Sequence, residues 1–196
     1  MVKVCTKWET SPRSRLCPKI TSGLLLREEV QKILVSSPHR YYTLKNEYPE
    51  LEGNFNVIHV TQYLSDLIKQ QKVKFGKGLK KRVVYQDPCY LGQYGGMYDE
   101  PRQVLKRIPG LAPVKMRESC EESLCSGGGG GEIWMDTEKR ERPSELRLGK
   151  AIEVGAEVLA VACPYCLLNF EGSRLTSDIG NTIEIKDVSE LLRKVL

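Results

Sequence analysis

Residues 157–166 read Glu-Val-Leu-Ala-Val-Ala-Cys-Pro-Tyr-Cys. The first six residues form an apolar run with the length and composition of a strand that is buried on both faces of a sheet. Strand and helix patterns alternate around it, with further strands expected at 56–60, 82–86, 112–116 and 182–185, and helices at 61–70, 100–108, 144–154 and 188–195. This alternation predicts an α/β fold, a parallel sheet flanked by helices in Rossmann-like layers.

Cysteines follow two of these strands. Cys89 comes shortly after the strand at 82–86, and Cys163 comes directly after the buried run. Because the carboxyl ends of parallel strands meet at the same edge of a sheet, we expect both thiols at one rim.

Composition indicates a cytoplasmic protein. The chain has 196 residues and a net charge of +5. It has no apolar run long enough to span a bilayer, and its first residues lack a signal peptide. The charge excess is too small to indicate nucleic-acid binding. In a reducing compartment the seven cysteines are expected to be metal ligands or redox thiols rather than disulfides.

The pair Cys163 and Cys166 alone fits a redox dithiol, half of a zinc site or half of an iron–sulfur site. A thioredoxin-like interpretation leaves Cys89 and the five glycines at 127–131 unexplained. A zinc site could use four cysteines but has no need for five glycines. An iron–sulfur cluster accounts for more, because its sulfides accept backbone N–H bonds and glycine lets the backbone approach closely.

Three segments together resemble one family: DPCYLGQYGG at 87–96, ESLCSGGGGGEIW at 122–134 and ACPYCLLNFE at 162–171. They are similar to the cysteine-rich CCG domain of heterodisulfide reductase and related iron–sulfur oxidoreductases. The family pattern is a cysteine, then Cys-Cys-Gly, then Cys-x-x-Cys, and the resemblance covers residues 83–192. It implies an iron–sulfur cluster that carries electrons.

The resemblance also implies which residues bind the cluster. The implied metal ligands are Cys89, Cys125, Cys163 and Cys166. Ser126 stands where the family has the second cysteine of its pair, and Ser126, Gly127, Gly128 and Gly129 are expected to line the cluster. The family's 4Fe-4S cluster is of a non-cubane type with five cysteines, whereas four thiolates are the right number for a cubane 4Fe-4S cluster or for zinc. The type of metal centre therefore stays open.

An internal repeat predicts the domain organisation. Ser37-Pro-His-Arg40 aligns with Cys163-Pro-Tyr-Cys166 at an offset of 126 residues, since 163 − 37 = 126. We expect a poorly ordered N-terminus (1–23), a remnant of a first CCG-type half that forms a truncated second α/β half (24–72), a solvated basic linker (73–82) and a CCG-type cysteine-rich domain (83–196). We interpret His39 and His59 as structural residues without ligand partners.

The resemblance predicts an iron–sulfur subunit of a heterodisulfide-reductase-like or electron-transfer-flavoprotein-linked oxidoreductase. The chain has no ferredoxin-type run of cysteines, so it needs a partner: a ferredoxin-type iron–sulfur subunit, an electron-transfer flavoprotein or a quinone-reducing subunit at the inner membrane face. One alternative is a structural or assembly subunit with zinc or no metal, from a truncated or split gene. Another is a stand-alone thiol oxidoreductase that uses Cys163 and Cys166.

Overall fold

A computed structural model describes residues 12–129, 141–177 and 182–196. The elements are, in chain order, α1 (Pro12–Arg27), β1 (Lys32–Val35), α2 (Pro38–Asn46), η1 (Tyr48–Leu51), β2 (Asn56–His59), α3 (Val60–Lys69), β3 (Lys81–Tyr85), α4 (Asp99–Arg107), β4 (Leu111–Pro113), η2 (Cys120–Glu122), α5 (Pro143–Glu153), β5 (Val158–Val161), α6 (Pro164–Thr176), β6 (Glu184–Asp187) and α7 (Val188–Arg193).

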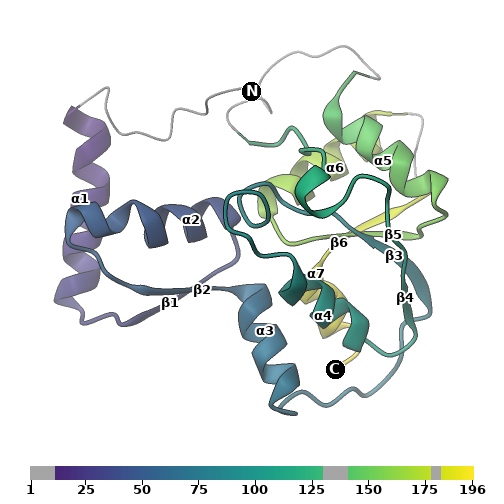
Figure 1. The fold of residues 1–196 in the computed structure, drawn as a ribbon, viewed down its shortest axis with the longest axis horizontal. Helices are drawn as coiled ribbons and strands as arrows, with labels where there is room; N and C mark the ends of the chain where they lie inside the picture. The colour runs from purple at the N-terminus through teal and green to yellow at the C-terminus, as the bar shows by residue number, and fades with distance from the viewer. Residues whose placement is uncertain (1–11, 130–140, 178–181) are drawn as a thin grey trace.

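The larger part of the chain is a parallel four-stranded sheet in the order β4-β3-β5-β6, with helices on both faces (Figure 1). Successive side chains of a strand point to opposite faces. Val83 therefore packs in one core cluster with Leu105 of α4 and Leu191 of α7, whereas Val84 packs in a second cluster with Leu148 of α5 and Phe170 of α6. The predicted α/β fold is confirmed.

The N-terminal part carries its own two-stranded parallel sheet, β1 with β2. Its order β1–α2–β2–α3 repeats the order β5–α6–β6–α7 of the larger sheet. The last helix of each unit begins with a capping box, formed by His59 and Gln62 in α3 and by Asp187 and Glu190 in α7. The truncated second α/β half thus has the architecture that the repeat predicts.

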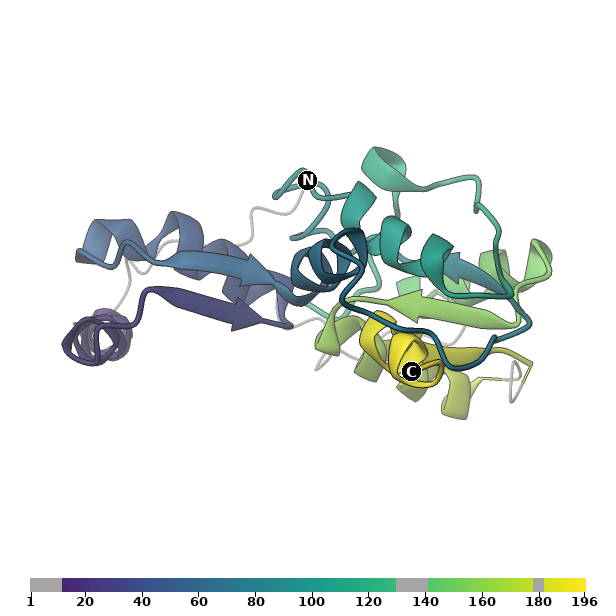
Figure 2. The ribbon, with the colours of Figure 1, turned by 90° about the horizontal axis from the view of Figure 1, so that it is seen from below.

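The two units pack closely through α3, which lies along α4. Ser65 Oγ donates a hydrogen bond to Gln103 Oε1 over 3.0 Å across this contact. The arrows of β1 and β2 point toward the larger sheet, and the strands of the larger sheet point back toward them (Figure 2). The carboxyl ends of both sheets, where sites form in α/β proteins, therefore face each other.

Two segments differ from the expectation. Helix α1 begins at Pro12, inside the segment 1–23 for which poor order is expected, and Ser22 Oγ in it donates to the Leu51 carbonyl oxygen over 3.1 Å. The segment 73–82 is not simply solvated, because its apolar residues alternate with the lysines and face inward. Its residues Val73, Phe75 and Leu79 pack against the core.

His59 gives the fold a pH dependence. The ring is fully buried, with Nδ1 2.8 Å from Thr61 Oγ1 and Nε2 3.2 Å from the Ser36 carbonyl oxygen. Burial lowers the pKa of His59 to about 4, although the Ser36 carbonyl opposes this shift. The structural role predicted for His59 agrees with this environment.

Acid should therefore destabilise the protein through His59. A base whose pKa falls on folding contributes stability that is complete above its unfolded pKa of about 6.5 and is lost as the pH falls toward 4. We expect the free energy of unfolding to drop by up to about 3 kcal/mol over this window. Urea unfolding at a series of pH values measures the drop. His59→Asn keeps a side chain that can cap α3 and should remove this part of the pH dependence; an unchanged profile would contradict the assignment.

Candidate functional site

The pair Cys163 and Cys166 lies where β5 passes into α6. Cys163 is the N-cap of α6, Pro164 occupies the first turn, and both thiols are buried. The side chain of Cys166 hydrogen-bonds Cys163 and lowers the pKa of the Cys163 thiol to about 5; His39 and the Cys166 backbone N–H add to this effect, while burial opposes it. The same contact, together with burial, raises the pKa of Cys166 well above its ordinary value. The pKa values of the two thiols therefore shift in opposite directions, downward for Cys163 and upward for Cys166.

Cys89 and Cys125 form a second pair of thiols. Cys89 follows β3, and Cys125 lies in the loop after η2. A hydrogen bond with the Cys125 side chain raises the pKa of Cys89, and burial adds to the shift. The charge of Cys163 also raises the pKa of Cys89, and that of Cys125 raises the pKa of Cys166. The four thiols are thus close enough to influence one another at a single rim of the sheet.

The glycine segment passes directly over the start of α6. Gly127 has a φ of +73°, which favours glycine. A Cβ atom on Gly128 would lie 2.8 Å from the Tyr165 carbonyl oxygen, and one on Gly129 would lie 3.2 Å from Nε2 of His39. The absence of a side chain is therefore a steric requirement at Gly128, and the backbone conformation favours glycine at Gly127. Gly130 and Gly131 lie outside the described residues.

Ser126 faces the thiols rather than solvent. Its Oγ donates to Cys166 Sγ over 3.2 Å and accepts from the Gly128 backbone N–H over 3.4 Å. The Asn169 side chain in α6 donates to the Ser126 carbonyl oxygen. Ser126 thereby occupies a position from which its oxygen could join the four thiols around a metal centre.

His39 is the residue that the sequence interpretation misplaced. It belongs to the first half, yet its ring centroid is 4.1 Å from that of Tyr90 and 5.3 Å from that of Tyr165, and its side chain hydrogen-bonds Cys163. It is therefore part of the site and not merely a structural residue. The alignment of Ser37-Pro-His-Arg40 with Cys163-Pro-Tyr-Cys166 is the feature of the sequence that could indicate this position of His39. The two aligned segments meet because the carboxyl ends of the two sheets face each other.

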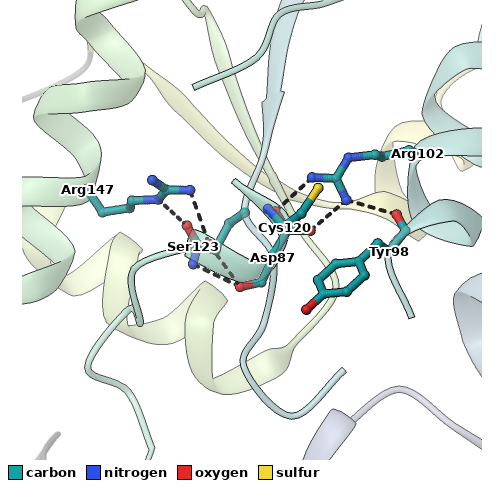
Figure 3. A network of polar contacts seen from close by, with 7 residues as sticks. Asp87, Tyr98, Arg102, Cys120, Ser123 and Arg147 are labelled. Atoms are coloured by element: carbon teal, nitrogen blue, oxygen red, sulfur yellow. Dashed lines mark hydrogen bonds and ion pairs between the residues drawn. The ribbon is translucent and has the colours of Figure 1, made fainter. Parts of the chain in front are cut away.

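A buried polar network holds the cysteine-bearing segments together beneath the rim (Figure 3). Asp87 accepts two hydrogen bonds from Arg102, at 2.6 and 2.7 Å, and a third from the Cys120 backbone N–H at 2.9 Å. Gln86 Nε2 donates to the carbonyl oxygens of Asp87 and Leu124, at 3.1 and 2.9 Å. The segment that leads to Cys89 and the loop that leads to Cys125 are therefore tied to each other.

The positions of the donors bear on which metal centre the thiols could hold. Within residues 12–129, 141–177 and 182–196, no three His, Cys, Asp or Glu side chains converge on a single ion. All four cysteines are free thiols, and they lie two by two, with Cys89 hydrogen-bonded to Cys125 and Cys163 to Cys166. Four thiolates are a donor set that an iron–sulfur cluster and a single zinc ion both accept.

Residues 83–171 match the family model of the cysteine-rich domain, CCG. The predicted resemblance to this family is therefore confirmed, and the matched segment contains all four thiols. In the part of the chain that the structure describes, none of the helices combines the length and apolar character needed to cross a bilayer.

The similarity to characterised proteins extends beyond residues 83–171. The chain is 37% identical over 166 residues to the probable iron-sulfur-binding oxidoreductase FadF of Bacillus subtilis, a match that covers 85% of this chain and 24% of that protein. It is 33% identical over 174 residues to the EtfAB:quinone oxidoreductase of Syntrophomonas wolfei, with coverages of 85% and 24%. It is 36% identical over 177 residues to one subunit of the dihydromethanophenazine:CoB--CoM heterodisulfide reductase of Methanosarcina barkeri, with coverages of 88% and 42%. The chain is thus related to iron–sulfur oxidoreductases and spans less than half the length of each.

Replacing Gly128 with alanine should open the site. The added Cβ meets the Tyr165 backbone, which cannot yield without moving α6, so we expect a loss of about 1–3 kcal/mol in the free energy of unfolding. The metal-free protein should also expose Cys166 to thiol reagents sooner. Gly149→Ala is the matched control, because Gly149 lies in α5 with open space around it. Urea unfolding and timed thiol titration of both variants measure the effect; equal behaviour would contradict the close approach.

Proposed function

We propose that this chain is the iron–sulfur cluster-binding subunit of an oxidoreductase related to heterodisulfide reductase or linked to electron-transfer flavoprotein. Cys89, Cys125, Cys163 and Cys166 are the proposed ligands, and the turn at Gly127–Gly129 lines the cluster. The observation that supports the proposal is that four thiols from three separate segments influence one another's pKa values, beside Gly128, where an added Cβ atom would meet the Tyr165 backbone. When bound, a 4Fe-4S cluster takes up and releases single electrons.

The protein's own residues prepare the site for an anionic centre. Metal ligation requires deprotonated thiols, and Cys163 already has its pKa lowered to about 5 by hydrogen bonds from Cys166 and His39. The backbone N–H of Gly127 donates to Cys125 Sγ over 3.4 Å. Hydrogen bonds to thiolate sulfur stabilise the charged form and help to set the reduction potential of a cluster.

Ser126 bears on the type of cluster. Its hydroxyl lies 3.2 Å from Cys166 Sγ, where the family has a second cysteine. A serine oxygen is a harder and less acidic ligand than a thiol. We propose a cubane 4Fe-4S cluster on the four cysteines, with the non-cubane type of the family as the alternative in which Ser126 serves as the fifth ligand.

Electron transfer requires partners. The relatives that this chain resembles include an EtfAB:quinone oxidoreductase and a probable membrane-anchored ferredoxin from Chromohalobacter salexigens. This chain spans 24% and 26% of their lengths. We propose that a ferredoxin-type iron–sulfur subunit or an electron-transfer flavoprotein exchanges electrons with the site, with a quinone-reducing membrane subunit as a further partner.

Metal analysis tests the proposed function. Protein purified without oxygen should contain about four irons and matching sulfide per chain and absorb broadly in the visible range. Cys125→Ser should lose most of this iron because it removes a proposed ligand. Cys120→Ser is the matched control: Cys120 lies on the same loop and only its backbone N–H takes part in the network through Asp87, so its iron content should stay normal. About one zinc per chain without colour would instead support a structural subunit.

A second variant tests the role of Ser126. Ser126→Cys restores the family's cysteine pair, so the paramagnetic resonance spectrum of the reduced protein should change if position 126 faces the cluster. The iron content provides the control, since it should be at least as high as in the unmodified protein. An unchanged spectrum with full iron content would remove Ser126 from the proposed site.

A further inference from the structure

Arg147 is a fully buried cation without an anionic partner among the described residues. It projects from α5, and none of its surface is exposed. Its Nε donates to Gln86 Oε1 over 2.6 Å, and Nη2 donates to Ser123 Oγ over 3.3 Å. The third nitrogen, Nη1, is buried and meets no acceptor in the part of the chain that the structure describes. All the groups that Arg147 contacts here are neutral.

The nearest carboxylates are already neutralised by other cations. Asp87 is paired with Arg102 through two short hydrogen bonds, and Glu118 is paired with Lys150 over 2.5 Å. Figure 3 shows Arg147 and Arg102 approaching the Asp87 segment from opposite sides. One buried carboxylate thus faces two guanidinium groups, and one positive charge is left over.

An unpaired buried charge is costly. Transfer of an isolated ion from water into a protein interior costs several kcal/mol even after relaxation, and burial lowers the pKa of Arg147, although Asp87 and Glu118 oppose the shift. Arginine nevertheless stays protonated in proteins. The fold therefore carries a buried guanidinium that makes no ion pair within the described residues.

The position of Arg147 shows where the balancing charge would be. Ser123 lies two residues before Cys125, and Gln86 lies three residues before Cys89. Gln86 also binds the carbonyl oxygen of Leu124, the neighbour of Cys125. The guanidinium is thus bonded to both cysteine-bearing segments, within three residues of Cys89 and of Cys125 along the chain. Four thiolates around an iron–sulfur core leave a centre with net negative charge.

We propose that Arg147 is the internal counter-cation of the cysteine site. Its guanidinium group positions the Cys89 and Cys125 segments through its hydrogen bonds. Its charge stabilises the more negative, reduced state of a bound cluster. This inference rests on the proposed function, because it requires an anionic centre at the thiols. Arg147 acts through Gln86 and Ser123 and does not touch the ligands, so it is a positioning residue.

The reduction potential of the loaded protein tests the charge. In Arg147→Gln, the ratio of reduced to oxidised cluster at a fixed potential should fall at least tenfold, which is a shift of about 59 mV to lower potential for a one-electron couple. Arg147→Lys keeps the charge but not the planar guanidinium, and it should change the ratio by less than Arg147→Gln does. Lys150→Gln is the matched control: it removes a partly exposed charge one turn further along α5, where solvent screens it.

The metal-free protein provides a readout that does not depend on activity. Arg147→Met removes the unpaired charge, and this gain offsets the hydrogen bonds lost to Gln86 and Ser123, so metal-free Arg147→Met should resist urea about as well as the unmodified protein. A clear loss of stability in this form would make Arg147 a structural residue and overturn the proposal. If Arg147→Gln and Arg147→Lys both lose the iron, geometry and not charge is decisive, and the charge role is overturned.

Iron content and reduction potential together distinguish the role of Arg147 from the cluster-binding function. Iron in the unmodified protein with an unchanged potential in Arg147→Gln overturns the role of Arg147 and leaves the proposed function standing. An unmodified protein without iron overturns both. A lowered potential in Arg147→Gln, with a smaller change in Arg147→Lys and with Lys150→Gln near the unmodified value, supports both.

Discussion

The parallel pairing of β3 with β5 is the constraint on which the site depends. Tyr85 lies opposite Ala160 in this ladder, so the two strands end side by side at the same rim. Cys89 and Cys163 follow these strand ends within a few residues. A slip of one strand would turn its side chains to the other face of the sheet, and the two thiols could no longer meet. The buried side chains on both faces of β5 hold the register.

Cys125 reaches this rim by a different route, since its loop belongs to no strand. Gln86, at the end of β3, holds the loop through the Leu124 carbonyl oxygen, and Asp87 holds it through the Cys120 backbone N–H. The side chains of Gln86 and Asp87 are buried, so loss of either hydrogen bond would leave a polar group of theirs costly to satisfy. The position of the third thiol therefore rests on a polar network, in contrast to the apolar strand ladder that places the other two.

The first half of the molecule contributes differently from the second. It keeps the β–α–β–α order and the capped last helix, but its Cys-Pro counterpart provides Ser37 and Arg40 in place of two thiols. Because the carboxyl ends of the two sheets face each other, the residue between them, His39, reaches Cys163. The N-terminal part of the molecule thus contributes His39 to the surroundings of Cys163.

The α/β class and the rim that gathers the cysteines follow from the order of residues alone. Strongly periodic or fully apolar segments such as 157–162 identify buried strands, and strand order along the chain implies parallel pairing. The repeat and the need for glycines beside the site can be read in the same way. These features are local or follow from simple topology, so no knowledge of the packing is needed to find them.

Completion of the site, in contrast, depends on tertiary packing. The placing of His39, the hydrogen bond from Ser126 to Cys166 and the uncompensated charge of Arg147 join residues that are far apart in the chain. The positions of these residues in the sequence follow no recognisable pattern, because their contacts depend on how the two sheets and α5 pack. Burial then sets their energy: the same arginine on the surface of α5 would be screened by water, whereas in the buried network of Gln86 and Ser123 its charge is screened far less.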